Sequence, residues 1–168
     1  IVVVSYPDLQ VVHTMCRMIH LPAPYVSGFL AFRECDSLLD MIKDLKRLHS
    51  HFVPDIIMVD GNGVLHPRGV GTCLSHCLSL LYYLHTTTNT GLASQLGVLC
   101  DVPTIGVAKN LLYVDGLRKE KILHEITSKI DEIKSTVPLS RKNVQKVNIP
   151  LQGTSGRVWG RALCFPPR

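Results

Sequence analysis

Residues 56–69 read IIMVDGNGVLHPRG, and this stretch decides the fold. Four apolar residues without polar alternation stand before Asp60, and two glycines and an asparagine follow it. An unbroken apolar run bounded by turn residues is typical of a parallel strand that is buried on both faces. The run TIGVA at 104–108 has the same character and precedes Lys109. Two such strands predict an α/β fold with a partly parallel sheet.

The segments on either side of this stretch supply the predicted helices. Residues 37–49 form an amphipathic pattern, and Ser37 with Asp40 predicts a capping box at the start of that helix. A second amphipathic helix is predicted over 118–134. It contains a Glu125–Lys129 pair in the favourable orientation. The predicted apolar faces are Leu38, Ile42, Leu45 and Leu48 on the first helix, and Ile122, Ile126, Ile130 and Ile133 on the second.

Short β-rich runs occur at both ends of the chain. Two of them flank Pro7-Asp8, which is the best turn signal near the N-terminus, and RVWGRALCF at 157–165 forms another. Strands that alternate with helices predict a mixed sheet flanked by helices. The length of 168 residues fits one globular domain with its own core, so we expect a single domain over 1–168.

The charge is distributed unevenly along the chain. Residues 1–108 hold six Lys/Arg and eight Asp/Glu, for a net charge of −2, whereas 109–168 hold twelve and five, for +7. A basic second half suits a polyanion such as nucleic acid, and an ordinary solvated surface accounts for the same bias equally well.

Composition excludes several classes of protein. A hydrophobic content of 46% with 18% charged residues excludes wholesale disorder. No stretch approaches the length of a membrane span, and IVVV at the N-terminus is too short for the core of a signal peptide. The six cysteines are scattered through a domain-sized chain, which favours a reducing compartment over a disulfide scaffold.

One segment fits the α/β pattern badly. Residues 69–100 contain no Lys, Arg, Asp or Glu, and the part at 72–90 lacks both clean periodicity and strong caps. It is either a buried helix followed by a loop or an insertion with no place in the core. Its cysteines and histidine in CLSHC at 73–77 invite a zinc interpretation, but no second pair stands at zinc-finger spacing.

Four residues are candidates for chemistry, and each has a plainer alternative. Asp60 and Lys109 follow predicted strands, at the edge of the sheet where α/β proteins bind ligands, but Asp60 can also cap a turn. Glu34 stands beside Arg33, as in an ordinary surface ion pair. His66 lies in a loop, where a lone histidine is more often a solvated side chain.

Taken together, these residue types suit the hydrolysis of a phosphodiester. The reaction needs neutralisation of transition-state charge and activation of a water, which carboxylates that hold a metal, with lysine and histidine nearby, can provide. Oxygen ligands favour Mg²⁺ or Mn²⁺ over zinc. We therefore predict a divalent metal shared by Glu34 and Asp60.

Several long blocks resemble the endonuclease V family, in its animal form. They are PYVSGFLAFRE at 24–34, VDGNGVLHPRG at 59–69, GLASQLGVLCDVPTIGVAK at 91–109, LYVDG at 112–116 and PLQGTSGRVWGRAL at 150–163. The resemblance implies an RNase H-like α/β domain that is incomplete at both termini. It also implies a metal-dependent endonuclease that cleaves RNA, or deaminated DNA, near inosine and leaves 5′-phosphate and 3′-hydroxyl ends.

Carried over by position, the resemblance assigns Glu34 and Asp60 to metal binding and His66 and Lys109 to the surroundings of the scissile phosphate. The cofactor is Mg²⁺, with Mn²⁺ as a substitute. The expected partner is single-stranded RNA or DNA that contains inosine, bound by a monomer in the cytoplasm, nucleus and nucleolus, with no membrane. The implied substrate-binding residues are Pro24, Tyr25, Val26 and Ser27, which form a wedge between bases, and Gly28 and Leu30, beside the pocket for the flipped base.

Three departures from the family pattern bear on activity. The first metal-binding aspartate of the family belongs to a strand upstream of Ile1, the segment 72–90 resembles no family block, and a C-terminal region with a further histidine is missing. We therefore expect 72–90 to be an insertion and expect this chain to cleave slowly or not at all. The alternative is a non-catalytic nucleic-acid-binding module. A dinucleotide-binding domain is disfavoured because GNGVLHPRG lacks the glycine spacing.

Overall fold

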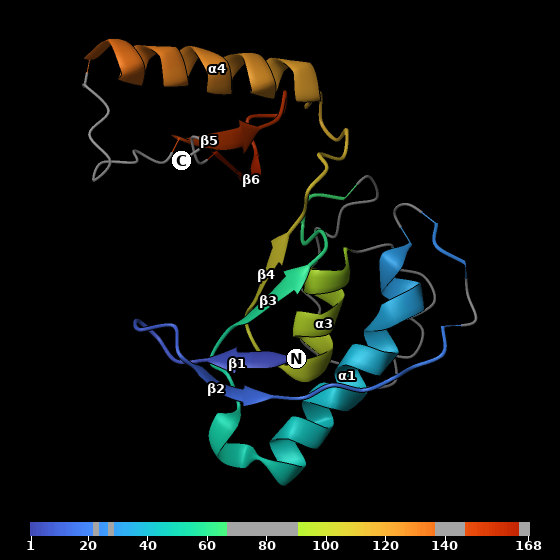
Figure 1. Cartoon of the computed structure of the whole chain (residues 1–168). Coiled ribbons are helices and arrows are strands. Elements are labelled where there is room, and N and C mark those ends of the chain that lie inside the picture. Colours follow the sequence, from blue (N-terminus) through green and yellow to red (C-terminus); the bar gives the residue numbers. More distant parts are fainter. Residues whose placement is uncertain (22–23, 27–28, 67–90, 137–146, 165–168) are drawn as a thin grey trace. The chain divides into compact units, whose positions relative to one another are not determined.

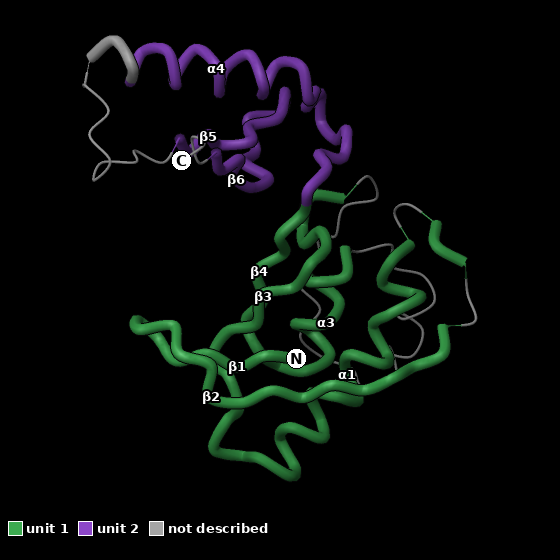
Figure 2. The backbone as a smooth tube through the Cα atoms, in the orientation of Figure 1, with its two compact units in different colours: residues 1–108 green, residues 109–168 purple. Residues whose placement is uncertain are grey.

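The two strands predicted from the apolar runs form and pair in parallel. β3 (Ile57–Asp60) lies beside β4 (Thr104–Val107), with Asp60 opposite Val107. In this computed structural model the described residues are 1–21, 24–26, 29–66, 91–136 and 147–164. They fall into two compact units, unit 1 (Ile1–Ala108) and unit 2 (Lys109–Arg168) (Figure 2). A single domain over 1–168 would require the two units to pack together, and this stays a prediction.

One helix of unit 1 packs against the parallel strand pair, and a second helix packs against the first. α1 (Leu30–Leu48) lies beside α3 (Leu92–Cys100), and α3 contacts β3 and β4 (Figure 1). A short 3₁₀ turn, η1 (Ser50–Phe52), follows α1. The predicted turn at Pro7-Asp8 joins β1 (Val2–Val4) to β2 (Val11–Thr14) in an antiparallel hairpin. The core consists of Ala31, Cys35, Ile42, Val59, Leu92, Ala93, Leu96, Cys100 and Val102.

The first helix begins seven residues before the predicted capping box, so the prediction that Ser37 and Asp40 start it is wrong. Phe29 precedes the first helical residue, and no side-chain hydrogen bond caps this end. Packing of the first turn against the core replaces the missing cap, because Ala31 is 4% exposed. The predicted apolar face is otherwise largely buried, except that Leu48 is 56% exposed at the last residue of the helix.

Among the described residues, the parallel strands are covered on one face only, which corrects the prediction of strands buried on both faces. Ile57 and Val59 pack into the core, whereas Met58, between them, is 69% exposed. Ile105, opposite Met58 on β4, is 46% exposed. Apolar sequence therefore shows that a strand is present, but not how many layers cover it.

The described residues of unit 2 form one helix and an antiparallel hairpin. α4 (Lys119–Thr136) matches the predicted second helix, and the Glu125–Lys129 pair is present at 3.7 Å. β5 (Val147–Gln152) pairs with β6 (Val158–Cys164), which confirms the strand predicted at the C-terminal end. The inward side chains Val147, Ile149 and Leu151 are buried, and β5 contacts α4 (Figure 1).

Two sequence predictions fall on residues that the structure does not describe. The proposed insertion at 72–90, with the zinc interpretation of its cysteines and histidine, lies outside the described residues.

In the part of the chain that is described, no helix is long and apolar enough to cross a bilayer.

Candidate active site

Glu34 occupies an unusual position on α1, because it lies on the stripe of the helix that faces the core. Residues three and four positions apart share a helix face, and three of the four neighbours of Glu34 at these distances are apolar, namely Leu30, Ala31 and Leu38, while the fourth is Ser37. All three apolar neighbours pack in or against the core cluster. The Glu34 side chain is 29% exposed. An acid among core-facing apolar residues points to a function other than solubility.

Asp60 ends β3 and is followed by the turn Gly61-Asn62-Gly63. The backbone N–H of Gly61 donates to the Val107 carbonyl at 2.8 Å, so strand pairing continues past Asp60. The Asn62 carbonyl accepts a hydrogen bond of 3.1 Å from the Ala93 N–H, in the first turn of α3. The turn is thus held between β4 and the N-terminal end of α3, and Asp60 has a defined position.

Two glycines outside the turn make this close packing possible, and the sequence analysis did not single them out. A Cβ on Gly106 of β4 would lie 2.5 Å from Gly63 N and 2.6 Å from Gly61 O. A Cβ on Gly91, the N-cap of α3, would lie 2.1 Å from Asn62 O. The available signal was Gly106 in the middle of an apolar strand run, since such a glycine often marks a close backbone approach.

The elements that carry the two acids adjoin each other. Leu30, one helical turn before Glu34, has its Cδ2 3.5 Å from the place that a Cβ on Gly61 would take. Strand alternation directs Asp60 to the face opposite Val59, however, and Val59 belongs to the same core cluster as the stripe of Glu34. An ion that both carboxylates bind must therefore lie beyond the end of β3. Their convergence on one ion stays a prediction.

The local electrostatics of Glu34 are set by its neighbour. Arg33 Nη1 lies 3.1 Å from Glu34 Oε1, so the ion pair considered in the sequence analysis is present. The described residues contain no group of three or more histidine, cysteine or acidic side chains arranged for a metal. Two carboxylates still fit Mg²⁺, because this ion is usually held by one or two carboxylates and completes its coordination with waters and substrate phosphates.

The two remaining catalytic candidates, His66 and Lys109, differ in burial and belong to different units. His66 is only 4% exposed, so its interpretation as a solvated loop side chain is wrong. Its backbone N–H donates to the Val64 carbonyl at 2.9 Å, which closes a tight turn six residues after Asp60. Lys109 is exposed, two residues after β4, and begins unit 2. Its approach to the acids of unit 1 stays a prediction.

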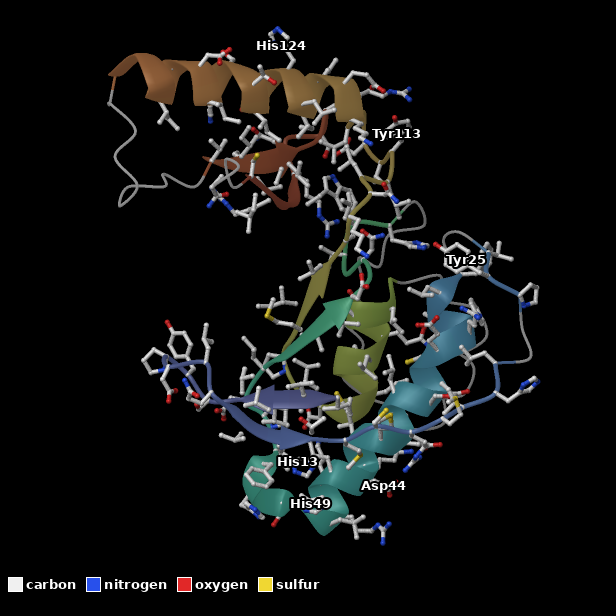
Figure 3. The ribbon with its side chains drawn as sticks, in the orientation of Figure 1. His13, Tyr25, Asp44, His49, Tyr113 and His124 are labelled. Carbon is white, nitrogen blue, oxygen red and sulfur yellow. The ribbon has the colours of Figure 1, made fainter. Side chains whose placement is uncertain are left out.

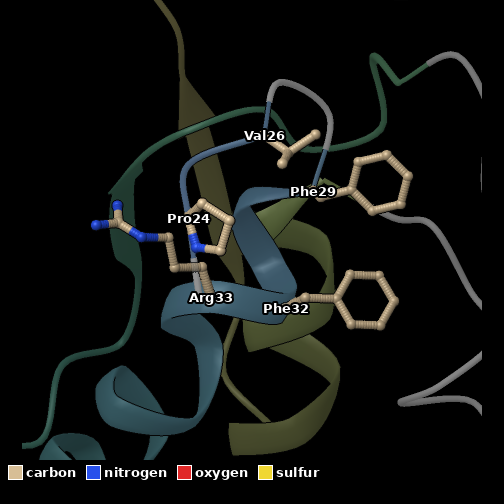
Figure 4. Close-up of a pocket in the computed structure, with 5 residues that line it drawn as sticks. All are labelled: Pro24, Val26, Phe29, Phe32 and Arg33. Atoms are coloured by element: carbon tan, nitrogen blue, oxygen red, sulfur yellow. The ribbon is translucent and has the colours of Figure 1, made fainter. Parts of the chain in front are cut away.

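The segment before α1 carries the predicted wedge and lines a pocket. Tyr25 is 66% exposed on this segment (Figure 3). The pocket has a volume of about 310 Å³ and a largely apolar wall (Figure 4). Ser27 and Gly28 lie outside the described residues. The residues that line the pocket are Pro24, Val26, Phe29, Phe32 and Arg33.

Unit 2 contains a polar network that the sequence analysis did not predict. Both carboxylate oxygens of Asp115 accept hydrogen bonds: from the Thr154 hydroxyl at 2.9 Å, from the N–H and hydroxyl of Ser155, and from Trp159 Nε1 at 2.9 Å. The Ser155 hydroxyl, then the Trp159 indole N–H, hold the pKa of Asp115 well below its usual range. The network ties the loop before α4 to the β5–β6 hairpin.

Comparison with known proteins gives consistent matches. The sequence model of the family described as Endonuclease V matches residues 1–82 and 83–155. Endonuclease V of Homo sapiens is 40% identical over 163 residues, which cover 97% of this chain and 46% of the human protein. That of Trichormus variabilis is 40% identical over 112 residues, 67% of this chain and 39% of the relative.

Solved structures agree. The catalytic domain of human Endonuclease V superimposes with a TM-score of 0.69 at 42% identity, covering 96% of this chain and 53% of that chain. Ciona intestinalis Endonuclease V, in complex with a 23mer DNA containing an inosine followed by a ribo-adenosine, gives a TM-score of 0.70 at 27% identity, covering 97% and 56%. These matches confirm the predicted α/β class, with which an RNase H-like fold agrees. The chain spans about half the length of the relatives it matches.

Proposed function

Since this chain belongs to the endonuclease V family, we propose that it carries core elements of an inosine-directed endonuclease. The reaction is metal-dependent hydrolysis of a phosphodiester in RNA, or in deaminated DNA, and it leaves 5′-phosphate and 3′-hydroxyl ends. The observation that carries the proposal is the position of Glu34. Within the described part of the chain its one hydrogen bond, from Arg33 at 3.1 Å, goes to Oε1, so Oε2 is available to a metal ion. Glu34 lies one helical turn from the residue that touches the turn after Asp60.

The four candidate residues would have different roles in the hydrolysis. Glu34 and Asp60 would hold Mg²⁺, or Mn²⁺ in its place. When bound, the ion supplies positive charge that stabilises the transition state of phosphodiester hydrolysis. His66, fixed in a tight turn, is suited to holding or moving a proton near the scissile phosphate. Lys109 would pair with a phosphate oxygen.

The segment before α1 would bind the substrate bases. An exposed aromatic ring can stack on a base, and Tyr25 offers one on the wedge segment. The adjoining pocket, walled by proline and phenylalanine side chains, has a size and polarity that suit a nucleobase. The inosine-containing DNA bound by the Ciona relative supports inosine as the recognised base.

Metal binding tests the proposal independently of turnover. Glu34→Gln and Asp60→Asn remove one charge each with little change in shape. The control is Asp40→Asn, which removes the same charge from the exposed face of α1, where Asp40 pairs weakly with Lys43 at 3.9 Å. Mn²⁺ titration followed by electron paramagnetic resonance should show about tenfold weaker binding, or more, for the first two variants only. Equal Mn²⁺ affinity in all three variants would refute a shared ion.

Cleavage of an inosine-containing single-stranded RNA in Mg²⁺ is the second measurement. If this chain is active, Glu34→Gln and Asp60→Asn should lower the rate about a hundredfold or more, and Asp40→Asn should not. If the chain binds the RNA without cutting it, the alternative of a non-catalytic binding module holds.

A further inference from the structure

The β5–β6 hairpin has two faces of different character. Alternation buries Val147, Ile149 and Leu151 of β5 on the face that packs with α4. Trp159 and Arg161 follow each other at two-residue spacing on β6, and Arg161 pairs in register with the exposed Pro150. Arg161 therefore lies on the outward face of the hairpin, whereas Trp159 lies at the register shift between Pro150 and Gln152 and is half-buried near the turn of the hairpin.

Near the turn of the hairpin an arginine stacks on an aromatic ring, and a second such pair lies in the loop before α4. The guanidinium carbon of Arg157 lies 4.2 Å from the centroid of the Trp159 ring. The guanidinium carbon of Arg118 lies 5.1 Å from the ring of Tyr113, which is 51% exposed in the middle of the loop before α4 (Figure 3). Both distances are in the range of cation–π contacts.

Asp115 connects the two pairs. It stands two residues after Tyr113, and its carboxylate accepts the hydrogen bond of the Trp159 indole at 2.9 Å. Because this bond fixes one edge of the indole, the ring orientation is set before anything binds. The Thr154 and Ser155 bonds to the same carboxylate hold the loop and the hairpin together.

The charge of the arginines is available for a ligand. Within the described part of the chain, neither Arg118 nor Arg157 lies within ion-pair distance of a carboxylate. Residues 109–168 hold twelve Lys/Arg against five Asp/Glu, a net charge of +7. A guanidinium held over an aromatic ring can bind a phosphate through its edge and stack a base on its outer plane.

We propose that Tyr113, Arg118, Arg157 and Trp159 form a binding surface for single-stranded nucleic acid that does not read the base sequence. We name it the arginine–aromatic surface. Unpaired strands are favoured over duplexes because only unstacked bases expose their planes for stacking. The choice of a polynucleotide as the ligand rests on the proposed function. The surface itself recognises flanking nucleotides, and it does not require inosine.

The test measures binding of the full chain to a labelled single-stranded RNA of about 15 nucleotides that contains no inosine. Fluorescence anisotropy is followed over a series of salt concentrations. Arg157→Ala and Arg118→Ala should each weaken binding about fivefold or more. Each should also reduce the salt dependence by about 0.7 in the log–log slope if the arginine contacts a phosphate. The matched control is Lys121→Ala, which removes an exposed positive charge from α4 in the same unit.

Arg157→Lys separates stacking from charge, because lysine keeps the charge and loses the plane. We expect this variant to bind clearly more weakly than the wild type. Binding of Arg157→Lys at wild-type strength, or equal losses for Arg157→Ala and Lys121→Ala, would overturn the proposal. Since Arg157 is exposed, unchanged far-ultraviolet circular dichroism and melting should accompany any loss.

The same assay distinguishes this proposal from the proposed function. Asp40→Asn, on the exposed face of α1, should bind the inosine-free RNA as tightly as the wild type, whether or not the chain cleaves. If the chain cleaves and neither Arg118→Ala nor Arg157→Ala weakens RNA binding, the arginine–aromatic surface alone is overturned. Binding that depends on the arginines, together with no effect of Glu34→Gln on Mn²⁺ binding, would overturn the metal site alone.

Discussion

Two acids, one in each unit, have opposite surroundings. Glu34 of unit 1 lies on a core-facing stripe, and among the described residues its one hydrogen-bond partner is Arg33 at 3.1 Å. Asp115 of unit 2 is bonded by two hydroxyls, a backbone N–H and an indole. An acid saturated by its own chain holds structure together, whereas an acid with oxygens to spare can take a ligand. Under the proposed function, the same side-chain chemistry therefore serves metal binding in unit 1, and it holds a loop and a hairpin together in unit 2.

The interiors of the two units can be compared most directly by truncating one buried side chain in each. Leu96 of α3 is 2% exposed and Ile149 of β5 is 0% exposed. Leu96→Ala and Ile149→Ala should each lower the free energy of unfolding by about 2–5 kcal/mol, through lost burial and a cavity. Urea denaturation measures both. The control Leu163→Ala, at a position 58% exposed, should change stability by less than about 0.5 kcal/mol. A loss as small as that of the control in either unit would show that its core is misassigned.

Replacing one strand glycine in each unit by alanine compares how closely the backbone packs at the two positions. Gly106→Ala should destabilise unit 1 by about 1–3 kcal/mol, because the new Cβ meets the backbone of the 61–63 turn and cannot be accommodated without moving it. Gly160→Ala on β6 should be nearly neutral, since its Cβ would meet Leu151 Cδ1 at an ordinary 3.8 Å. Thermal melting of the two variants decides the matter. Similar melting points would mean that the turn is not clamped.

The pH dependence of stability should single out Asp115. Hydrogen bonds to the charged form lower its pKa in the folded state from the ordinary 3.8. The stabilisation is therefore fully present above pH 3.8 and is lost as the pH falls through the lower, folded-state value. Asp115→Asn should be less stable than the wild type at neutral pH, and the difference should shrink on acidification. Urea titrations over a pH series check this, with Asp55→Asn, at an exposed acid, as the control. A difference independent of pH would contradict it.

The smallest effect is expected for the surface pair of α4. Lys129 lies 3.7 Å from Glu125, and the two side chains are 44% and 48% exposed. Lys129→Ala should cost no more than about 0.3–0.5 kcal/mol, and less at high salt. Chemical denaturation at low and high salt gives the answer. A loss of several kcal/mol would mean that surface charge, rather than the buried face of β5, holds unit 2 together.

Local pattern predicted the elements well where it had a strong period or a clear break. Both parallel strands, the helix of unit 2 and the hairpin at Pro7-Asp8 were predicted from alternation, spacing and turn residues. The start of α1 was not predicted, because its first turn lacks a capping side chain and is stabilised by burial of Ala31. A helix end that depends on packing leaves no local signal.

The candidate site was predicted in part. The sequence indicated Glu34, Asp60 and His66 through residue type and the family resemblance. It did not indicate that His66 is buried, nor that Gly91 and Gly106 clamp the turn after Asp60. These facts depend on residues far apart in the chain that meet only after folding.

The amino-acid sequence by itself determined the two parallel strands, the helix of unit 2, the basic character of 109–168 and the identity of the acids, because each depends on neighbouring residues or on composition. It did not predict α3 or β5. Only the tertiary structure decided which acid is saturated and which is not. Asp115 and Trp159 are 44 positions apart, and their hydrogen bond exists because a loop and a hairpin pack together. Whether a side chain is satisfied depends on its surroundings in space, and the sequence near it does not record them.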